Sequence, residues 1–451
     1  MPLLLARWHL EIDRFSAPFM ALAAGVTAAV LVGAPRRSLT RRVSPTDDDL
    51  MHVAKTALLT LGSAVGVYCS VDLLILSGFL LVGLLPSATP LTVTPGDDLA
   101  ELRRVSRIRS RYGLVATLPI LLATVVVARS RFELGSPTPF DLSDPRAMHG
   151  TASTVVFALL ALALLARKAV APLHSWMPVA LIRGPIAVSV LSVSTHLGAF
   201  LALRVLPILV PESTGAGLRA LAMVALASAM YQAIVALGQR NMARAVAYVI
   251  NSQLAMVLVG IGTSGLEGLH GSLLQMLSIG LVATGLLLTV AWVEARAGST
   301  DLSKLGGLAR DFPRLAWSFL LFGLVAVGAP GTLSWVAEDL LLQSLLSHHP
   351  VIAAVLLLTT MLHGITILRV FFQAFFGKPR FDTNSELPDL VRYERTISYL
   401  LLITIAGLGL APQAIIVLQR PAIDAMLHVT EAIRHEVGTN APNLTDRLIN
   451  P

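Results

Sequence analysis

Apolar runs separated by short polar segments recur along nearly the whole chain, and charged residues or Pro/Gly bound each run. A membrane-spanning helix needs about 20 consecutive, predominantly apolar residues. The pattern therefore predicts an all-α polytopic membrane protein with about 12 transmembrane helices. The expected spans are 15–34, 55–69, 72–90, 112–128, 151–180, 185–209, 217–238, 244–263, 271–295, 315–345, 351–373 and 397–418.

These spans divide the chain into four expected parts. An N-terminal helix and a basic loop occupy 1–54, and a first group of five helices occupies 55–209. A second group of five helices occupies 217–373, and a C-terminal helix with a tail occupies 374–451.

Composition narrows the class further. Apolar residues make up 55% of the 451 residues and charged residues only 14%, whereas soluble domains carry about 25% charged residues. The single cysteine, Cys69, excludes an internal disulfide, a thiolate zinc site and a cysteine-ligated iron–sulfur cluster. The histidines show no pairing that would ligate haem. We therefore expect no cofactor and no metal, with any redox chemistry in a partner; whether the chain takes part in an enzyme stays open.

The net charge of +7 would fit a nucleic-acid partner, but the basic residues fall in short segments between apolar runs. Segments such as 103–111 and 304–314 are rich in Arg, whereas alternate segments between spans hold only Arg129, Arg131 and Arg146. Basic residues concentrate in cytoplasmic loops of membrane proteins. The distribution of charge therefore predicts an orientation with the N-terminus outside. We expect the protein to lie in a bacterial cytoplasmic (inner) membrane and to have no nucleic-acid partner.

Two expected spans, 151–180 and 315–345, are interrupted by proline and polar residues. The interruptions read RKAVAPLHSWMP (167–178) and GAPGTLSWVAED (328–339), and each has Ala-Pro followed by Ser-Trp. They are the fifth and tenth spans, so a five-helix repeat would be inverted between them. Broken helices at corresponding positions of two halves are typical of transport sites. The alternative is that both are ordinary proline kinks.

Four ionisable residues lie within expected spans: Lys168 and His174 in 151–180, His196 in the middle of 185–209, and Glu338 in 315–345. Such groups are costly in a bilayer and are functional candidates, and burial and nearby charge shift their proton affinity widely. They therefore form a candidate proton pathway. The alternatives are a Lys168 that snorkels to the headgroups, a structural His196, and a Glu338 that merely ends a helix.

Several stretches together resemble one family over roughly 15–418. They are RKAVAPLHSWMPVAL (167–181), MARAVAYVINSQLA (242–255), DLSKLGGL (301–308), GAPGTLSWVAEDLLL (328–342) and LRVFFQAFFGKP (368–379). The pattern resembles the antiporter-like subunits of respiratory complex I and of multisubunit cation/proton antiporters, most closely the M-type subunit. The resemblance implies two inverted five-helix repeats, each with a broken helix.

The resemblance also implies roles for particular residues. Lys168 matches the family's broken-helix lysine, and Glu338 matches the acidic residue of the second broken helix. His196 falls where the M-type subunit has a second lysine.

Two positions depart from the family. Its key glutamate aligns with Leu80, and the central histidine or lysine of the second half aligns with Ile279 or Ser278. Asp72 lies eight residues before Leu80, about 12 Å along a helix, so it does not simply replace the glutamate.

The leading hypothesis is a proton-translocating membrane subunit of a multisubunit energy-coupling complex. A second is the membrane subunit of a proton-driven inorganic-carbon uptake complex, to which the family is related. A third is a degenerate scaffold that no longer pumps. The expected partners are the lipid bilayer and other subunits, either a redox module or a zinc-binding carbonic-anhydrase-like protein.

Overall fold

The computed structural model describes residues 9–36, 38, 46–85, 99–144, 148–263, 265–346, 349–378, 388–421 and 423–424. Helices account for most of these residues, and three isolated bridges are the sole β-type pairings among them. The predicted all-α class is confirmed.

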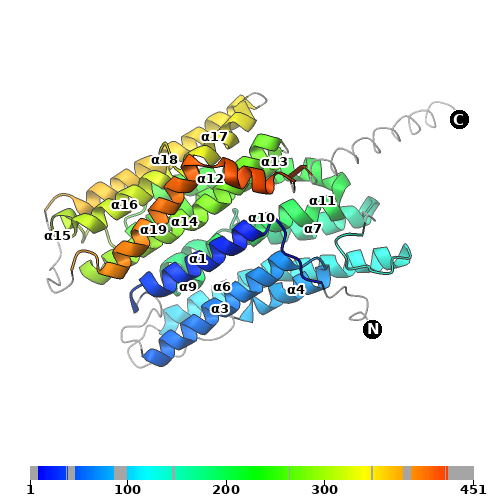
Figure 1. Cartoon of the computed structure of the whole chain (residues 1–451), viewed down its shortest axis with the longest axis horizontal. Coiled ribbons are helices and arrows are strands. Elements are labelled where there is room, and N and C mark those ends of the chain that lie inside the picture. Colours follow the sequence, from blue (N-terminus) through cyan, green and yellow to red (C-terminus); the bar gives the residue numbers. More distant parts are fainter. Residues whose placement is uncertain are drawn as a thin grey trace.

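The long helices lie side by side with their axes roughly aligned (Figure 1). Between residues 17 and 209 the helices are α1 (Ala17–Gly33), α3 (Asp47–Cys69), α4 (Leu73–Val82), α6 (Leu99–Glu133), α7 (Gly150–Arg167), α8 (Trp176–Arg183), α9 (Ile186–Ser194), α10 (Leu197–Phe200), the π-helix η2 (Leu201–Val205) and α11 (Leu206–Leu209). Between residues 211 and 410 they are α12 (Pro211–Leu237), α13 (Met242–Thr263), α14 (Leu266–Ala297), α15 (Leu308–Asp311), α16 (Pro313–Ala326), α17 (Leu333–Leu346), α18 (Pro350–Phe375) and α19 (Arg392–Leu410).

Local sequence explains several helix ends. Thr46 and Asp49 form a capping box at the start of α3, which satisfies backbone donors that a helix leaves free. The Asp72 side chain caps α4 by accepting hydrogen bonds from the backbone N–H groups of its first turn. Gly298, with φ of 68°, ends α14 in the left-handed conformation that favours glycine.

Every predicted span overlaps a helix or a pair of helices, but their lengths differ. Among the described residues, eight helices are long and apolar enough to cross a membrane, or nine with the bent pair Arg392–Leu410 and Gln413–Pro421. The apolar helices α1, α4 and α16 are shorter than this criterion requires. The span expected at 72–90 runs into 86–98, which lies outside the described residues, as do most residues of the expected tail. The count of 12 spans and the division into four parts stay predictions.

Both expected breaks are present, so neither span is one continuous helix. Helix α7 ends at Arg167 and α8 begins at Trp176, while α16 ends at Ala326 and α17 begins at Leu333. The expected span 185–209 contains a third break, at Thr195 and His196, followed by the π-helix η2. The sequence did not predict this break, because no proline marks it.

Helix α14 is enclosed by the rest of the protein. Its most apolar window is 100% buried, and it packs on α1, α9, α13, α16 and α17. Small residues allow the close contact, since a Cβ at Gly280 or Gly285 would lie 2.6 Å or less from Leu22 or Phe322. Helix α14 therefore connects α1 and α9 with α13, α16 and α17.

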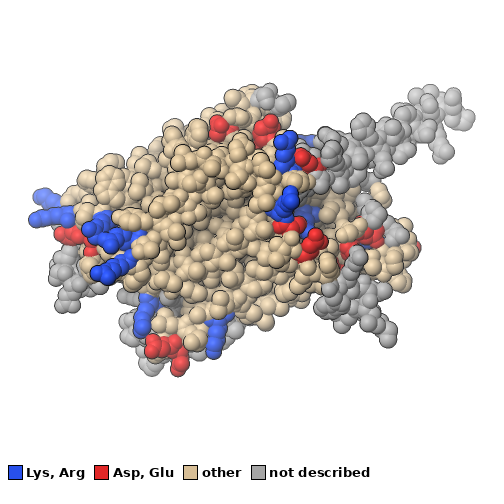
Figure 2. All heavy atoms as spheres, viewed as in Figure 1, with Lys and Arg blue, Asp and Glu red and all other residues tan. Residues whose placement is uncertain are grey.

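Charged side chains leave a broad band of the visible surface uncharged (Figure 2). Lys and Arg gather at the end of the molecule where α15 lies, as expected from their concentration in alternate segments. One expectation needs refinement, because Arg103–Arg111 is not a loop but the first part of the 35-residue helix α6. A helix of this length spans about 52 Å, more than the roughly 30 Å hydrocarbon core, so its basic end extends beyond the apolar layer.

Candidate functional site

The structure brings Lys168 and His196 into direct contact. The Lys168 Nζ atom lies 2.8 Å from Nδ1 of His196, and the two residues are 2% and 3% exposed. Lys168 therefore does not snorkel to the surface. A buried hydrogen bond between two ionisable side chains is the central feature of the candidate site.

Both residues lie where the backbone leaves the helical conformation. Ala169, next to Lys168, has φ of 49° and His196 has φ of 47°; among the described residues these are the non-glycine residues with positive φ. Such conformations cost about 1–3 kcal/mol each and cluster at functional sites. The π-helix that follows His196 is also a feature frequent at such sites. Strain at both ends of one contact supports a functional reading of the pair.

Side chains from a neighbouring helix hold the first break. Ser228 Oγ on α12 accepts a hydrogen bond from the backbone N–H of Ala171 at 2.8 Å. Gln232 Nε2 donates to Ser228 Oγ at 2.8 Å and to the Ala169 carbonyl at 3.4 Å. Two of the backbone groups freed by the break, the Ala171 N–H and the Ala169 carbonyl, are thus paired inside the protein, as the membrane favours.

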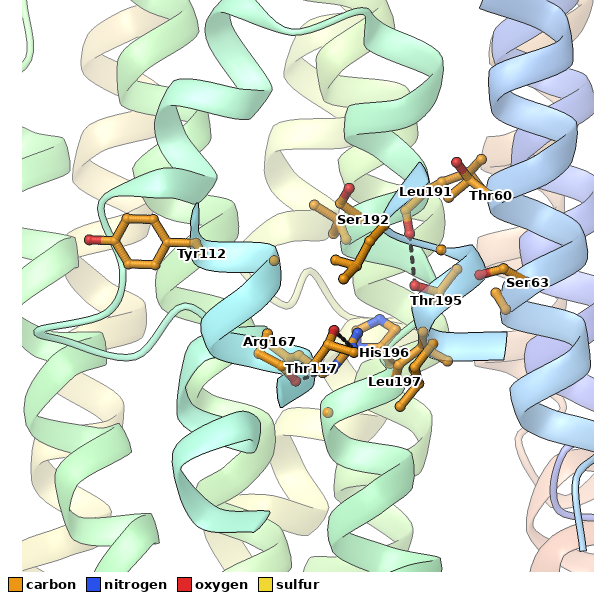
Figure 3. A pocket seen from close by; sticks show the side chains of 18 of the residues that line it. Thr60, Ser63, Tyr112, Thr117, Arg167, Leu191, Ser192, Thr195, His196 and Leu197 are labelled. Atoms are coloured by element: carbon orange, nitrogen blue, oxygen red, sulfur yellow. Dashed lines mark hydrogen bonds between the residues drawn. The ribbon is translucent and has the colours of Figure 1, made fainter. Parts of the chain in front are cut away.

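A cavity of about 120 Å³ lies beside the pair. The polar and charged residues that line it are Thr60, Ser63, Arg109, Tyr112, Thr117, Arg167, Lys168, Ser192, Thr195 and His196. In Figure 3, Thr60 and Ser63 of α3 lie on one side and Tyr112 of α6 on the other, with the His196 ring between them. One ordered water needs about 10–15 Å³ of such volume and two or more polar partners, so several waters fit.

One of the two positions at which the sequence departs from the family resemblance lies at this cavity. Leu80 of α4, which the family resemblance aligns with a glutamate, lines the cavity together with Lys168. Asp72 does not replace that glutamate, because its carboxylate caps the opposite end of α4.

The contact between Lys168 Nζ and His196 Nδ1 is compatible with a simple proton arrangement. When Lys168 donates to Nδ1, the proton of a neutral His196 ring resides on Nε2. The Nε2 atom is buried with no hydrogen-bond partner among the described residues, and the ring interacts with the backbone of Met276 on α14. The pair thus reaches from the first group of helices to the central helix α14.

Glu338 lies on α17, beside the second break. Its carboxylate lies against Gly328, where an added Cβ would be 2.8 Å from Oε2, and its Oε1 atom is buried with no hydrogen-bond partner among the described residues. One turn earlier on α17, the Ser334 hydroxyl is 2.5 Å from that of Ser278 on α14. Helix α17 continues to Leu346, so Glu338 does not end a helix.

His174 is placed differently from the other candidates. It lies in the first break, its ring packs edge-on against Tyr231 with centroids 5.4 Å apart, and it is not among the residues that line the cavity.

His363 of α18 was not among the site residues predicted from the sequence. This residue is fully buried, and its Nε2 lies 2.8 Å from Ser252 Oγ, which itself donates to the Ala229 carbonyl at 2.7 Å. The Nδ1 atom has no partner among the described residues. A signal was available: Thr359, His363 and Thr366 are spaced four and three residues apart, so they lie on one face of an apolar span.

Known proteins with similar sequences and structures agree with this fold. The sequence profile of the family described as "NADH:quinone oxidoreductase/Mrp antiporter, TM" matches residues 100–366. The NAD(P)H-quinone oxidoreductase chain 4 of Gloeobacter violaceus is 25% identical over 98% of this chain and 83% of its own length. Among solved structures, a chain of respiratory complex I from Thermus thermophilus with bound NADH superimposes with a TM-score of 0.82 at 26% identity, covering 94% of this chain and 86% of that chain. A chain of the Mrp complex from Dietzia sp. has the same fold, with a TM-score of 0.79 at 21% identity over 93% of this chain and 85% of that chain.

Proposed function

Because this chain belongs to the NADH:quinone oxidoreductase/Mrp antiporter family, we propose that it is a proton-translocating membrane subunit of a multisubunit complex. The observation that carries the proposal is the buried Lys168–His196 hydrogen bond beside a cavity with room for water. Relatives named as quinone oxidoreductase subunits and a complex I chain of the same fold support the setting in a larger complex.

The chemistry of the pair is proton exchange between two nitrogen atoms. A protonated Lys168 donates to Nδ1 of a neutral His196, and transfer along this hydrogen bond leaves a neutral amine and an imidazolium. The imidazolium then releases its Nε2 proton on the side of α14. Because two positive charges at this distance repel, the pair favours one excess proton at a time, which suits loading and release.

A hydroxyl contact supports a connection between the two halves. His196 interacts with the backbone of Met276 on α14. Two residues later, Ser278 contacts Ser334, one turn from Glu338. Hydroxyl groups both donate and accept hydrogen bonds, so they suit a proton route. In this proposal Glu338 is the terminal acceptor, and His174 at the first break is a candidate for access from the membrane surface.

The direct test is proton transport by membrane vesicles that contain the chain with its native partners. Substitution of Lys168 or Glu338 should stop that transport. If it does not, the scaffold hypothesis replaces this one. The inorganic-carbon hypothesis has the same pathway but a different partner, and purification in mild detergent followed by identification of the co-purifying chains distinguishes a redox module from a zinc-binding partner.

We expect Leu80→Glu to move the pH dependence of transport to higher pH. The substitution places a carboxylate in the cavity of Lys168, and an opposite charge nearby stabilises the ammonium form. The measurement is the initial rate of vesicle acidification between pH 6 and pH 9, with gluconate as the sole anion so that no small anion can act as a counter-charge. Leu80→Gln, of similar size but neutral, is the matched control, and equal profiles for the two variants would contradict the prediction.

We also propose that the basic end of the molecule faces the cytoplasm. Cysteines introduced by Ser106→Cys and Ser303→Cys should be protected from a membrane-impermeant maleimide in intact cells, whereas Pro137→Cys on the opposite side should react. The background is low, because the native Cys69 is buried. Labelling of Ser106→Cys or Ser303→Cys in intact cells would reverse the orientation.

A further inference from the structure

The cavity beside Lys168 has an unbalanced charge. Arg109, Arg167 and Lys168 all line it, and no Asp or Glu is among the described residues that do. Arg167 donates to the Ala116 carbonyl at 3.2 Å and to the Thr117 hydroxyl at 2.9 Å, both neutral groups. Neither guanidinium forms an ion pair with a carboxylate within the described part of the chain.

Charges in an apolar surrounding are costly unless a counter-charge accompanies them. At the one position where the family resemblance places an acidic residue in this cavity, the chain has Leu80. The described residues that line the cavity therefore include three cationic side chains and no carboxylate to balance them.

We propose that a small monovalent anion, of the halide or bicarbonate class, binds in this cavity and serves as the counter-ion of Lys168. The inference rests on the proposed function, since it names a ligand of the same site. The anion supplies the negative charge that a carboxylate would supply at position 80, where this chain has the uncharged Leu80.

The lining suits such a ligand. Arginine, lysine and hydroxyl groups are hydrogen-bond donors, and hydrogen bonds to an ionised partner are the stronger kind. The hydroxyls of Thr60, Ser63 and Ser192 lie on the cavity wall together with the cations. A volume of about 120 Å³ admits a halide with water or one bicarbonate.

The anion also has a consequence for proton transfer. With a counter-ion present, Lys168 can hold its proton without a protein carboxylate, and transport then depends on the anion concentration. Loss of the anion leaves the positive charge unbalanced, so the loading step is disfavoured.

Two measurements on the purified complex test the proposal. The first is the midpoint of thermal unfolding while chloride or bicarbonate replaces gluconate at constant ionic strength. We expect either anion to raise the midpoint of the wild type by several degrees in a saturable manner. The second is proton transport in vesicles, which should fall at least fivefold when gluconate is the sole anion.

Variants at position 80 assign the effect to the cavity. Leu80→Glu supplies an internal counter-charge and should remove the anion dependence of both measurements, whereas Leu80→Gln should keep it. If Leu80→Glu does not assemble, Arg109→Gln should raise the half-saturating chloride concentration about tenfold.

The outcomes separate this inference from the proposed function. If neither anion changes the midpoint or the rate, or if Leu80→Glu responds to anions as the wild type does, the anion site is wrong, even when Lys168→Ala abolishes transport. If anions raise the wild-type midpoint and Leu80→Glu removes the effect, the anion site stands, even when Lys168→Ala leaves transport intact. A response to one of the two anions alone supports the site and identifies its ligand.

Discussion

Lys168→Ala should reduce proton translocation by about a hundredfold or more, and Glu338→Gln should do the same. Removal of a positioned proton donor or acceptor typically lowers the rate by a factor of about 10²–10⁴. In the proposed relay every proton passes through each residue in turn, so the loss of one residue affects all transport. Assembly should survive both changes. Lys168→Ala enlarges a cavity that already exists, and Glu338→Gln preserves the size of the side chain. The measurement is the rate of pH-gradient formation in vesicles, normalised to the amount of assembled complex.

Matched controls separate the relay from general effects of charge. Asp339→Asn changes the neighbouring carboxylate, which accepts a hydrogen bond from Gln343 one turn away, and Lys304→Ala removes an exposed lysine. Both should retain wild-type transport. Full activity in Lys168→Ala together with Glu338→Gln would rule out the proposed relay.

Glu394→Ala should destabilise the protein by about 3–5 kcal/mol, because removing one partner leaves a buried charge uncompensated. Arg296 Nη2 lies 2.6 Å from Glu394 Oε2, and the two side chains are 3% and 5% exposed. The pair ties α14 to α19, and Glu394 also accepts a hydrogen bond from the backbone N–H of Val391 at the start of α19. Both contacts are lost in the variant.

The free energy of unfolding in detergent measures this effect. Glu133→Ala is the matched control, because its partner Arg129 and Glu133 are 82% and 63% exposed, and such pairs contribute about 0–1 kcal/mol. The double substitution Arg296→Met with Glu394→Leu should recover much of the loss, since apolar residues often replace a buried ion pair without cost. Equal destabilisation in Glu394→Ala and Glu133→Ala would contradict the assignment.

The sequence predicted those parts of the fold that depend on local chemistry. Apolar runs of about 20 residues correspond to helices because the bilayer requires internal backbone pairing. The breaks near Pro172 and Pro330 were predictable, because proline removes a backbone donor. The excess of arginine over acidic residues at 103–111 likewise indicated one end of the molecule.

The contacts of the site depended on tertiary packing instead. Nothing in the sequence around His196 indicates a left-handed residue, since the conformation is imposed by the surrounding helices. The approach of Lys168 depends on Gly198, where a Cβ would lie 3.2 Å from the Lys168 Cγ atom. His363 was missed because its partner Ser252 lies 111 residues away on another helix. Lys168 and His196 were identified as ionisable residues in apolar spans and matched again by the family resemblance, and the structure adds that they are hydrogen-bonded.

The enclosure of α14 determines which helices of this protein are affected by bilayer thickness. Helix α14 has 32 residues, about 48 Å at 1.5 Å per residue, so an isolated helix of this length would be subject to hydrophobic mismatch and would tilt. Because protein and not lipid surrounds α14, its tilt is set by its neighbours. The mismatch energy acts instead on the peripheral helices, such as α18, whose apolar window is only 33% buried. Lipids of different chain length should therefore strain the rim of the protein while the central helix keeps its register.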